Sequence, residues 1–550
     1  GHEIVTNDNS FFDTVVIQLS NMSIKSLKEK ALKHNFNLMY HENGLVGISL
    51  DEKTDYNEVE VLANLFDAHN DSQNTYDIFK PNRTGDILTH SIFQSINSET
   101  EMLRYINKLE KRDLSLNYSM IPLGSCTMKL NATVEMIPIS WPEFNSIHPF
   151  APLNQAKGYE EIINELEKML YKVTGFDAVS FQPNSGAQGE YAGLLSIREY
   201  HKANNSKRDV CLIPESAHGT NPASAIMAGL KVVIVKCDDH GNIDYEDLSK
   251  KVDEAGDQLS SLMVTYPSTH GVFEHNIDEI CNLIHENGGL VYMDGANLNA
   301  MVGVCKPGKF GADVMHINLH KTFCIPHGGG GPGMGPICVN EKLKPHLPKH
   351  SFTDEDFSYS VSSSPFGSAS ILLISYIYMK LMAANGLLKA SQVAILSANY
   401  MAKRLENDYS ILYRGKSGLN AHEFIVDCRS FKSTANITNE DIAKRLIDYG
   451  FHAPTMSWPI PGTLMIEPTE SETKSELDKF CDAMIAIKQE IVDIESGKMP
   501  QEDNVLVNAP HTVNDICDDC WISILLVPYE HTHLSIVAQL RDMPIKLQEG

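Results

Sequence analysis

The sequence predicts an α/β fold in which one large domain on a mainly parallel sheet is followed by a smaller α+β domain. Short apolar runs recur between about residues 160 and 340, and helical periodicity separates most of them. Such runs are typical of parallel strands that helices cover on both faces. After Gly418 a shorter series of strand and helix patterns begins, which predicts the second domain.

The N-terminal part of the chain predicts a small α+β unit. A β-branched run at 13–19 and a short apolar run at 45–50 predict strands. The amphipathic pattern at 23–34 predicts a helix, with Ser23 at its N-cap. Proline, asparagine and glycine in residues 81–86 predict a linker after this unit.

The large domain is expected to begin its sheet at 178–181, followed by the loop 182–187 and a helix that reaches Tyr200. Residues 368–405 predict a long helix, and its apolar stretch Ile371 to Met382 should be buried because it has no polar face. Further buried strands are predicted at 210–214, 232–235, 262–265 and 290–293.

The smaller domain alternates strands and helices in the same way. Strands are predicted at 422–428 and 463–466, and helices at 439–449 and 475–494. The patterns divide the chain into an N-terminal unit, the large domain, the small domain and a C-terminal tail, with expected boundaries 1–95, 96–385, 386–500 and 501–550.

Composition excludes several classes of function. The 550 residues include 45 Lys+Arg and 71 Asp+Glu, a formal net charge of −26, which argues against binding to nucleic acid or to an anionic membrane surface. No apolar stretch approaches the roughly 20 residues of a membrane-spanning helix. Eleven scattered cysteines suggest free thiols in a reducing compartment. The chain begins at Gly1 without a presequence-like segment, so we expect its true start to be missing.

The segment from His316 to Phe323 holds the most informative residue, Lys321, at the end of an apolar, strand-like run. Burial of an ammonium group is costly unless a partner compensates for it. A buried lysine therefore has a lowered pKa, and its neutral amine can form a Schiff base. A solvated loop lysine is the ordinary alternative, but the surrounding sequence argues against it.

Three further features belong with Lys321. Asp294 follows a buried strand, at the edge where α/β sheets place their ligands. The segment 185–187 lies between a strand and a helix, and such a helix N-terminus suits a phosphate group. His218 follows the next strand and offers an aromatic lid. Together these features are the layout expected for pyridoxal 5′-phosphate (PLP): a phosphate anchor, a ring lid, an anion for a ring nitrogen and a Schiff-base lysine.

Other motifs are weaker. The glycine run 328–335 lacks the lysine and hydroxyl of a P-loop, and no dinucleotide fingerprint is present. His316, His320 and His327 could suggest a metal, but no carboxylate or cysteine set completes a ligand shell, so we expect no metal site. The lone CxxC at 517–520 has no second pair.

Five long, uninterrupted strings are specific enough to compare with known families. They are MIPLGSCTMKLN at 120–131, FQPNSGAQGEY at 181–191, SAHGTNPASA at 216–225, YPSTHGVFE at 266–274 and LHKTFCIPHGGGGPGMGP at 319–336. These strings resemble glycine dehydrogenase (decarboxylating), the P-protein family of the glycine cleavage system. The resemblance runs from about Phe11 to about Asp519. Only the tail of that family's N-terminal half is expected within 1–95, and residues 520–550 look unrelated to the family.

The resemblance implies a PLP-dependent transferase fold of the aspartate-aminotransferase-like type (fold type I). It implies that Lys321 holds PLP as a covalent Schiff base and that Asp294 pairs with the pyridinium nitrogen. His218 would stack on the ring, and residues 125–127 are similar to a loop that closes over the substrate. The remaining cofactor contacts implied are Ser185, Gly186 and Ala187 at the phosphate and Thr269 in the pocket.

The same resemblance implies decarboxylation of glycine, with transfer of the aminomethyl group to the lipoyl arm of the H-protein. The family is homodimeric in its full-length form, and it acts in the mitochondrial matrix of eukaryotes or in the bacterial cytoplasm. Another fold-type I enzyme, an aminotransferase or a lyase, stays possible; Arg414 and Arg429 could serve an aminotransferase as carboxylate ligands. A non-catalytic structural half is the third alternative, and the presence of Lys321 argues against it.

Overall fold

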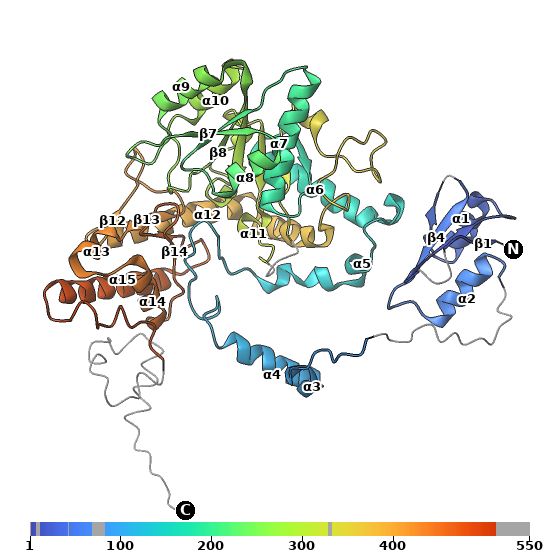
Figure 1. Cartoon of the computed structure of the whole chain (residues 1–550), viewed down its shortest axis with the longest axis horizontal. Helices are drawn as coiled ribbons and strands as arrows, with labels where there is room; N and C mark the ends of the chain where they lie inside the picture. The colour runs from blue at the N-terminus through green and yellow to red at the C-terminus, as the bar shows by residue number, and fades with distance from the viewer. Residues whose placement is uncertain (1, 7–10, 42, 69–82, 328–332, 513–550) are drawn as a thin grey trace, which may run out of the picture. The chain divides into compact units, whose positions relative to one another are not determined.

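The computed structural model describes residues 2–6, 11–41, 43–68, 83–327 and 333–512 (Figure 1). The chain forms two compact units, 1–102 and 103–550, and each is described by itself. The CxxC at 517–520, the atypical tail and part of the glycine run lie outside the described residues. The finer domain boundaries expected from the sequence stay predictions.

The N-terminal unit is a four-stranded antiparallel sheet in the order β1-β2-β4-β3 with two helices. Ser23 caps the first helix by accepting a hydrogen bond from the backbone N–H of Ser26, so the predicted helix start is confirmed. The elements are β1 (Glu3–Ile4), β2 (Thr14–Gln18), α1 (Ile24–Lys33), β3 (Met39–Tyr40), β4 (Leu45–Ser49) and α2 (Tyr56–Leu65). Two further helices follow, α3 (Ile92–Ser95) and α4 (Glu99–Glu110).

A seven-stranded sheet forms the centre of the second unit. From β7 through β6, β8 and β9 to β10 all neighbours are parallel, whereas β11 is antiparallel to both β10 and β5. The predicted α/β fold with a mainly parallel sheet is therefore confirmed. The strands are β5 (Ala178–Ser180), β6 (Val210–Pro214), β7 (Lys231–Val235), β8 (Leu259–Thr265), β9 (Leu290–Gly295), β10 (Val314–Ile317) and β11 (Ile337–Val339).

Helices cover both faces of this sheet, as the apolar strands require. Alternate residues of β9 show the two faces: Val291 and Met293 belong to one core cluster, and Leu290 and Tyr292 to the other. On the first face lie α6 (Lys157–Thr174), α9 (Tyr245–Ala255) and α10 (Ile277–Glu286); on the second lie α7 (Gly186–Ala203) and α8 (Thr220–Met227).

The long helix α12 (Leu372–Leu405) joins the large and small domains. Its first part packs into the core of the large domain, and its last turns, with Ala398 and Met401, pack into the core of the small domain. The backbone turns at Ala383, where φ is +50°. Among the described residues, 369–405 is the one helical stretch with the length and apolar composition to cross a membrane.

The small domain is an antiparallel sheet in the order β12-β13-β15-β14, covered by helices. All four elements predicted here are confirmed. The four are β13 (Phe424–Asp427), α14 (Asn439–Asp448), β15 (Thr463–Ile466) and α15 (Lys474–Glu495). The domain also contains β12 (Ser410–Ile411), α13 (Arg429–Ala435) and β14 (Thr455–Met456). The segment 120–131 runs beside this sheet, with Leu123 bridged to Ile466.

One local expectation is wrong. Lys321 does not end a strand: β10 stops at Ile317, and Lys321 lies in the single helical turn α11 (Leu319–Thr322). The carbonyl of Asn318 accepts hydrogen bonds from the N–H groups of Lys321 and Thr322. Periodicity cannot separate these structures, because a short apolar run fits a buried strand and a buried helical turn equally well.

Candidate active site at the carboxyl edge of the parallel sheet

Three polar residues are aligned across the carboxyl ends of neighbouring strands. Asp294 on β9 pairs in register with Thr265 on β8 and with His316 on β10. Ligands of open α/β sheets bind outside this edge, because the loops that follow the strands meet there. The site is therefore assembled by strand register, although the three residues lie far apart in the sequence.

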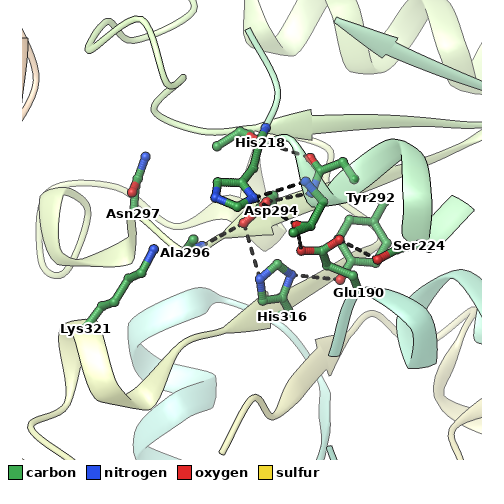
Figure 2. Close-up of polar contacts among 12 residues, drawn as sticks. Glu190, His218, Ser224, Tyr292, Asp294, Ala296, Asn297, His316 and Lys321 are labelled. Atoms are coloured by element: carbon green, nitrogen blue, oxygen red, sulfur yellow. Dashed lines mark hydrogen bonds and ion pairs between the residues drawn. The ribbon is translucent and has the colours of Figure 1, made fainter. Parts of the chain in front are cut away.

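Asp294 is buried and fully hydrogen-bonded. Its Oδ2 accepts from the Asn221 amide at 2.9 Å, its Oδ1 accepts from the backbone N–H of Ala296 at 2.9 Å, and His316 Nε2 lies 3.3 Å from Oδ1 (Figure 2). Burial alone would raise the pKa of Asp294, but His316, His218 and these hydrogen bonds hold it below its usual value. The site therefore keeps a buried negative charge.

A second layer fixes the imidazole behind Asp294. His316 Nδ1 lies 2.8 Å from the hydroxyl of Tyr292. Beside it, Glu190 accepts hydrogen bonds from Thr220 at 2.6 Å and Ser224 at 2.7 Å. Glu190 and Asn221 were missed by the sequence reasoning, and His316 was considered only as a metal ligand, because nothing in a single sequence indicates which polar side chains meet behind a strand end.

His218 lies on the loop after β6, beside Asp294. Its backbone N–H donates to Thr265 Oγ1 at 3.0 Å, its Nδ1 lies 2.8 Å from Thr220 Oγ1, and its ring packs edge-on against Trp458 of the small domain. Burial lowers the pKa of His218, which Asp294 partly offsets. The hydrogen bonds and the contact with Trp458 therefore hold the His218 ring in place.

Lys321 is buried and extends toward the side of the site where Asp294 and His218 lie (Figure 2). Its Nζ donates to the backbone carbonyl of Ser125 at 2.8 Å. The next carbonyl, of Thr322, accepts from Lys129, which is paired with Glu470 of the small domain at 2.8 Å. The segment 120–131 thus holds the turn that carries Lys321.

The N-terminus of α7 comes close to the same turn. Ser185 is its N-cap and accepts from the N–H of Gln188 at 3.1 Å, while the first N–H groups of a helix lack partners within the helix. A Cβ on Gly186 would lie 2.2 Å from Asn318 Oδ1, and one on Gly189 would lie 2.6 Å from the carbonyl of Gly335. The glycines of this motif therefore let the helix end approach Lys321.

Thr269 is buried, but its contacts are structural. Its hydroxyl and its N–H both donate to the carbonyl of Ser216, at 2.9 and 3.1 Å. Thr269 thus fixes the backbone two residues before His218. Of the predicted site residues, Lys321, Asp294, His218 and the α7 N-terminus surround one region, and Thr269 supports its loop.

The small domain contributes a buried cluster of titratable side chains that was not predicted from the sequence. His422 and Glu423 precede β13, and Glu467 follows β15. All three are at most 1% exposed. Burial raises the pKa of Glu467 to about 7 and lowers that of His422 to about 3. The sequence did hold a signal for these three residues, because each is a titratable residue next to a short, largely apolar strand.

The arginines suggested for an aminotransferase are engaged elsewhere. Arg414 pairs with Glu406 at 3.0 Å, and Arg429 pairs with Asp427 at 2.6 Å on an exposed surface. Neither is among the residues that surround Lys321 in the described structure.

Metal-ligand geometry occurs at two places in the described residues, Glu190–Asp294–His316 and His422–Glu423–Glu467. In the first group the ligand atoms already serve as hydrogen-bond partners. Neither group contains His320 or His327, so the three histidines considered from the sequence do not form one site. The rings of His320 and His327 pack on each other with centroids 5.1 Å apart.

Comparison with known proteins shows the family and the fold of the chain. Residues 2–66 and 80–350 match the family model described as "Glycine cleavage system P-protein", and residues 390–511 match "Glycine dehydrogenase, C-terminal domain". Among solved structures, an inhibitor-bound glycine decarboxylase (P-protein) aligns with a TM-score of 0.60 at 17% identity, covering 80% of this chain and 99% of that one. A glutamate decarboxylase from Lactobacillus brevis aligns with a TM-score of 0.57 at 13% identity, covering 73% and 93%. The predicted PLP fold type I is thereby confirmed.

Two curated relatives are similar over most of the chain. "Glycine dehydrogenase (decarboxylating)" of Thermosynechococcus vestitus is 58% identical over 93% of this chain and 54% of its own length. The mitochondrial protein of that name from Dictyostelium discoideum is 56% identical over 94% and 54%. The chain thus spans about half the length of the curated relatives it matches. Its match over more than half of its residues shows that the chain belongs to the glycine cleavage system P-protein family.

Proposed function

We propose that Lys321 binds PLP as a covalent Schiff base and that the bound site decarboxylates glycine. The observation that carries the proposal is a buried amine that extends toward a buried, charged carboxylate in a chain of the P-protein family. The donor set fits PLP: a helix N-terminus for phosphate, an anion for the ring nitrogen and an amine for the aldehyde.

Each residue has a physical task in this proposal. Ser185, Gly186 and Ala187 present the hydroxyl and N–H groups of the α7 N-terminus to phosphate. The negative charge of Asp294 holds a proton on the ring nitrogen, because an adjacent anion stabilises the cationic form. His218 packs against the ring, and Thr269 keeps the His218 loop in place.

When bound, PLP supplies an electron sink for the electron pair that the departing CO₂ leaves behind. The chain's own residues orient the substrate and exclude water. Arg414 and Arg429, the arginines considered for an aminotransferase, are paired with Glu406 and Asp427, so neither supports a transaminase-type salt bridge to a substrate carboxylate. A carboxylate held by a strong ion pair is stabilised in the ground state, which opposes its loss as neutral CO₂.

We further propose that the aminomethyl group passes to the lipoyl arm of the H-protein, as the family membership supports. The complete protein would be a homodimer, with the half of the relatives that this chain does not span completing the assembly. It would act in the mitochondrial matrix if the source is a eukaryote, as the name of the Dictyostelium relative indicates, and in the cytoplasm otherwise.

Borohydride trapping tests the cofactor proposal directly. Protein incubated with PLP and reduced should carry phosphopyridoxal on the peptide that contains Lys321, and Lys321→Ala should carry none. Glycine-dependent exchange of ¹⁴CO₂ should depend on the same residue. Label on another lysine, or exchange that survives Lys321→Ala, would overturn the proposal. The partner assignment fails if lipoylated H-protein and free lipoate support equal rates.

A further inference from the structure

Three buried titratable side chains beside Lys321 have no task in the proposed function: His422, Glu423 and Glu467. One ligand atom from each lies within 4.8 Å of the others. Both ring nitrogens of His422, Oε1 of Glu423 and Oε2 of Glu467 have no hydrogen-bond partner within the described structure. Unpartnered buried polar atoms are costly, so a cluster of them next to a reactive amine calls for a functional reason.

The two glutamates are connected to Lys321 through the segment 125–127. Glu423 Oε2 accepts from the N–H of Ser125 at 2.6 Å, and the carbonyl of Ser125 accepts from Lys321 Nζ at 2.8 Å. Glu467 Oε1 accepts from the Thr127 hydroxyl at 2.5 Å. Ser125 has φ +60°, a left-handed conformation that a non-glycine residue keeps only when its surroundings impose it. The glutamates supply that restraint.

Charge balance limits the protonation of the cluster. Two buried carboxylates this close repel each other strongly, and burial and this repulsion raise the pKa of Glu423. His422 is neutral and cannot compensate, while Lys321 supplies a positive charge that acts on both carboxyls. The other titratable groups that face Glu467 are the Cys126 thiol and Glu470, which is already paired with Lys129; the Asn299 amide donates to Glu467 Oε1 at 3.3 Å. One proton shared by the two glutamates makes the cluster neutral while Lys321 is cationic.

We propose that Glu423 and Glu467 form a one-proton carboxyl pair that positions the Lys321 amine through Ser125 and balances its positive charge. The inference deepens the proposed function and rests on Lys321 as its reactive group. Glu423 and Glu467 are positioning residues, because they act on Lys321 through the segment 125–127.

Substitution by glutamine separates charge from position. A Gln at 423 or 467 keeps a carbonyl oxygen that accepts the Ser125 N–H or the Thr127 hydroxyl. If the pair shares one proton, either single substitution leaves the remaining glutamate free to ionise, and the net charge of −1 is retained. Only Glu423→Gln/Glu467→Gln removes the charge. The effects of the two substitutions should therefore be strongly non-additive.

The first test is the pH titration of the absorption band of the Lys321–PLP Schiff base. Each single Gln variant should move the midpoint by less than about 0.3 pH unit, and the double variant should lower it by at least about one unit, since loss of a nearby negative charge disfavours the protonated imine. Glu274→Gln is the matched control: it removes a buried carboxyl bonded to Asn242 and Ile243, and it should leave the midpoint unchanged. Equal, additive shifts from the single variants, or no shift in the double variant, would overturn the proposal.

A second measurement needs neither PLP nor a stable double variant. The infrared difference spectrum of wild type minus Glu423→Gln at neutral pH should contain the C=O stretch of a protonated carboxylic acid, which moves on transfer to D₂O. The spectrum of wild type minus Glu467→Gln should contain the same band. If the band is absent from both difference spectra, the pair holds no proton. If no Schiff base forms at all, the cofactor proposal fails while the infrared result still decides the state of the pair.

Discussion

Gly186→Ala tests a very close packing contact at the site. The new methyl group would lie 2.2 Å from Asn318 Oδ1 and 2.9 Å from Asn318 Cγ, where ordinary contacts begin near 3.4 Å. Asn318 is buried, and its carbonyl accepts from the N–H of Lys321, so helix α7 or the Lys321 turn must shift by about 1 Å. Overpacking of this kind costs about 1–3 kcal/mol, against a gain of up to about 1 kcal/mol from the better helix former.

The assays are thermal unfolding and PLP binding followed by absorbance. We expect Gly186→Ala to lower the melting temperature by a few degrees and to weaken PLP binding at least about tenfold, because the phosphate anchor moves relative to Lys321. Gly158→Ala is the matched control: it also lies in the first turn of a helix, α6, and a Cβ there meets nothing within 4 Å. It should be neutral or slightly stabilising. Wild-type stability and PLP affinity in Gly186→Ala would refute the reasoning.

Three further outcomes are expected. Lys129→Met should cost about 3 kcal/mol in urea unfolding, because it leaves the largely buried Glu470 carboxylate without its partner; an unchanged midpoint would contradict a buried ion pair there. Burial raises the pKa of Glu274 to about 7, above its ordinary 4.5, so the stability that Glu274 contributes should weaken as the pH rises from about 4.5 to 7. The free energy of unfolding of wild type should fall by up to about 3 kcal/mol relative to Glu274→Gln across that window. Parallel pH–stability curves for the two proteins would contradict the raised pKa. Asp294→Asn should still be labelled on Lys321 by PLP and borohydride but lose at least about a hundredfold in glycine-dependent CO₂ exchange, so near-normal exchange would refute the role of the charge.

The predicted elements that form the site were largely correct because apolar runs and helix caps are local signals. Strand β9 and the cap at Ser185 lie where the pattern places them. The error at Lys321 has a local cause too, since a buried run as short as α11 does not distinguish a strand from a helical turn. Long family strings contain Lys321 and His218, and Asp294 was identified by its position after a buried strand, but neither signal indicated the residues that hold these three in place.

By itself, the sequence determined the α/β fold class and the order of the main strands and helices, and it singled out the lysine that we propose binds the cofactor, because periodicity and contiguous motifs are encoded along the chain. Only the tertiary structure decided which side chains meet. Strand register set His316 against Asp294, and the small domain placed Glu423 against Ser125 and Glu467 against Thr127, which precede them by 298 and 340 residues in the chain. The electrostatic effect of these side chains on one another depends on distance and burial, and neither quantity can be read from residue order.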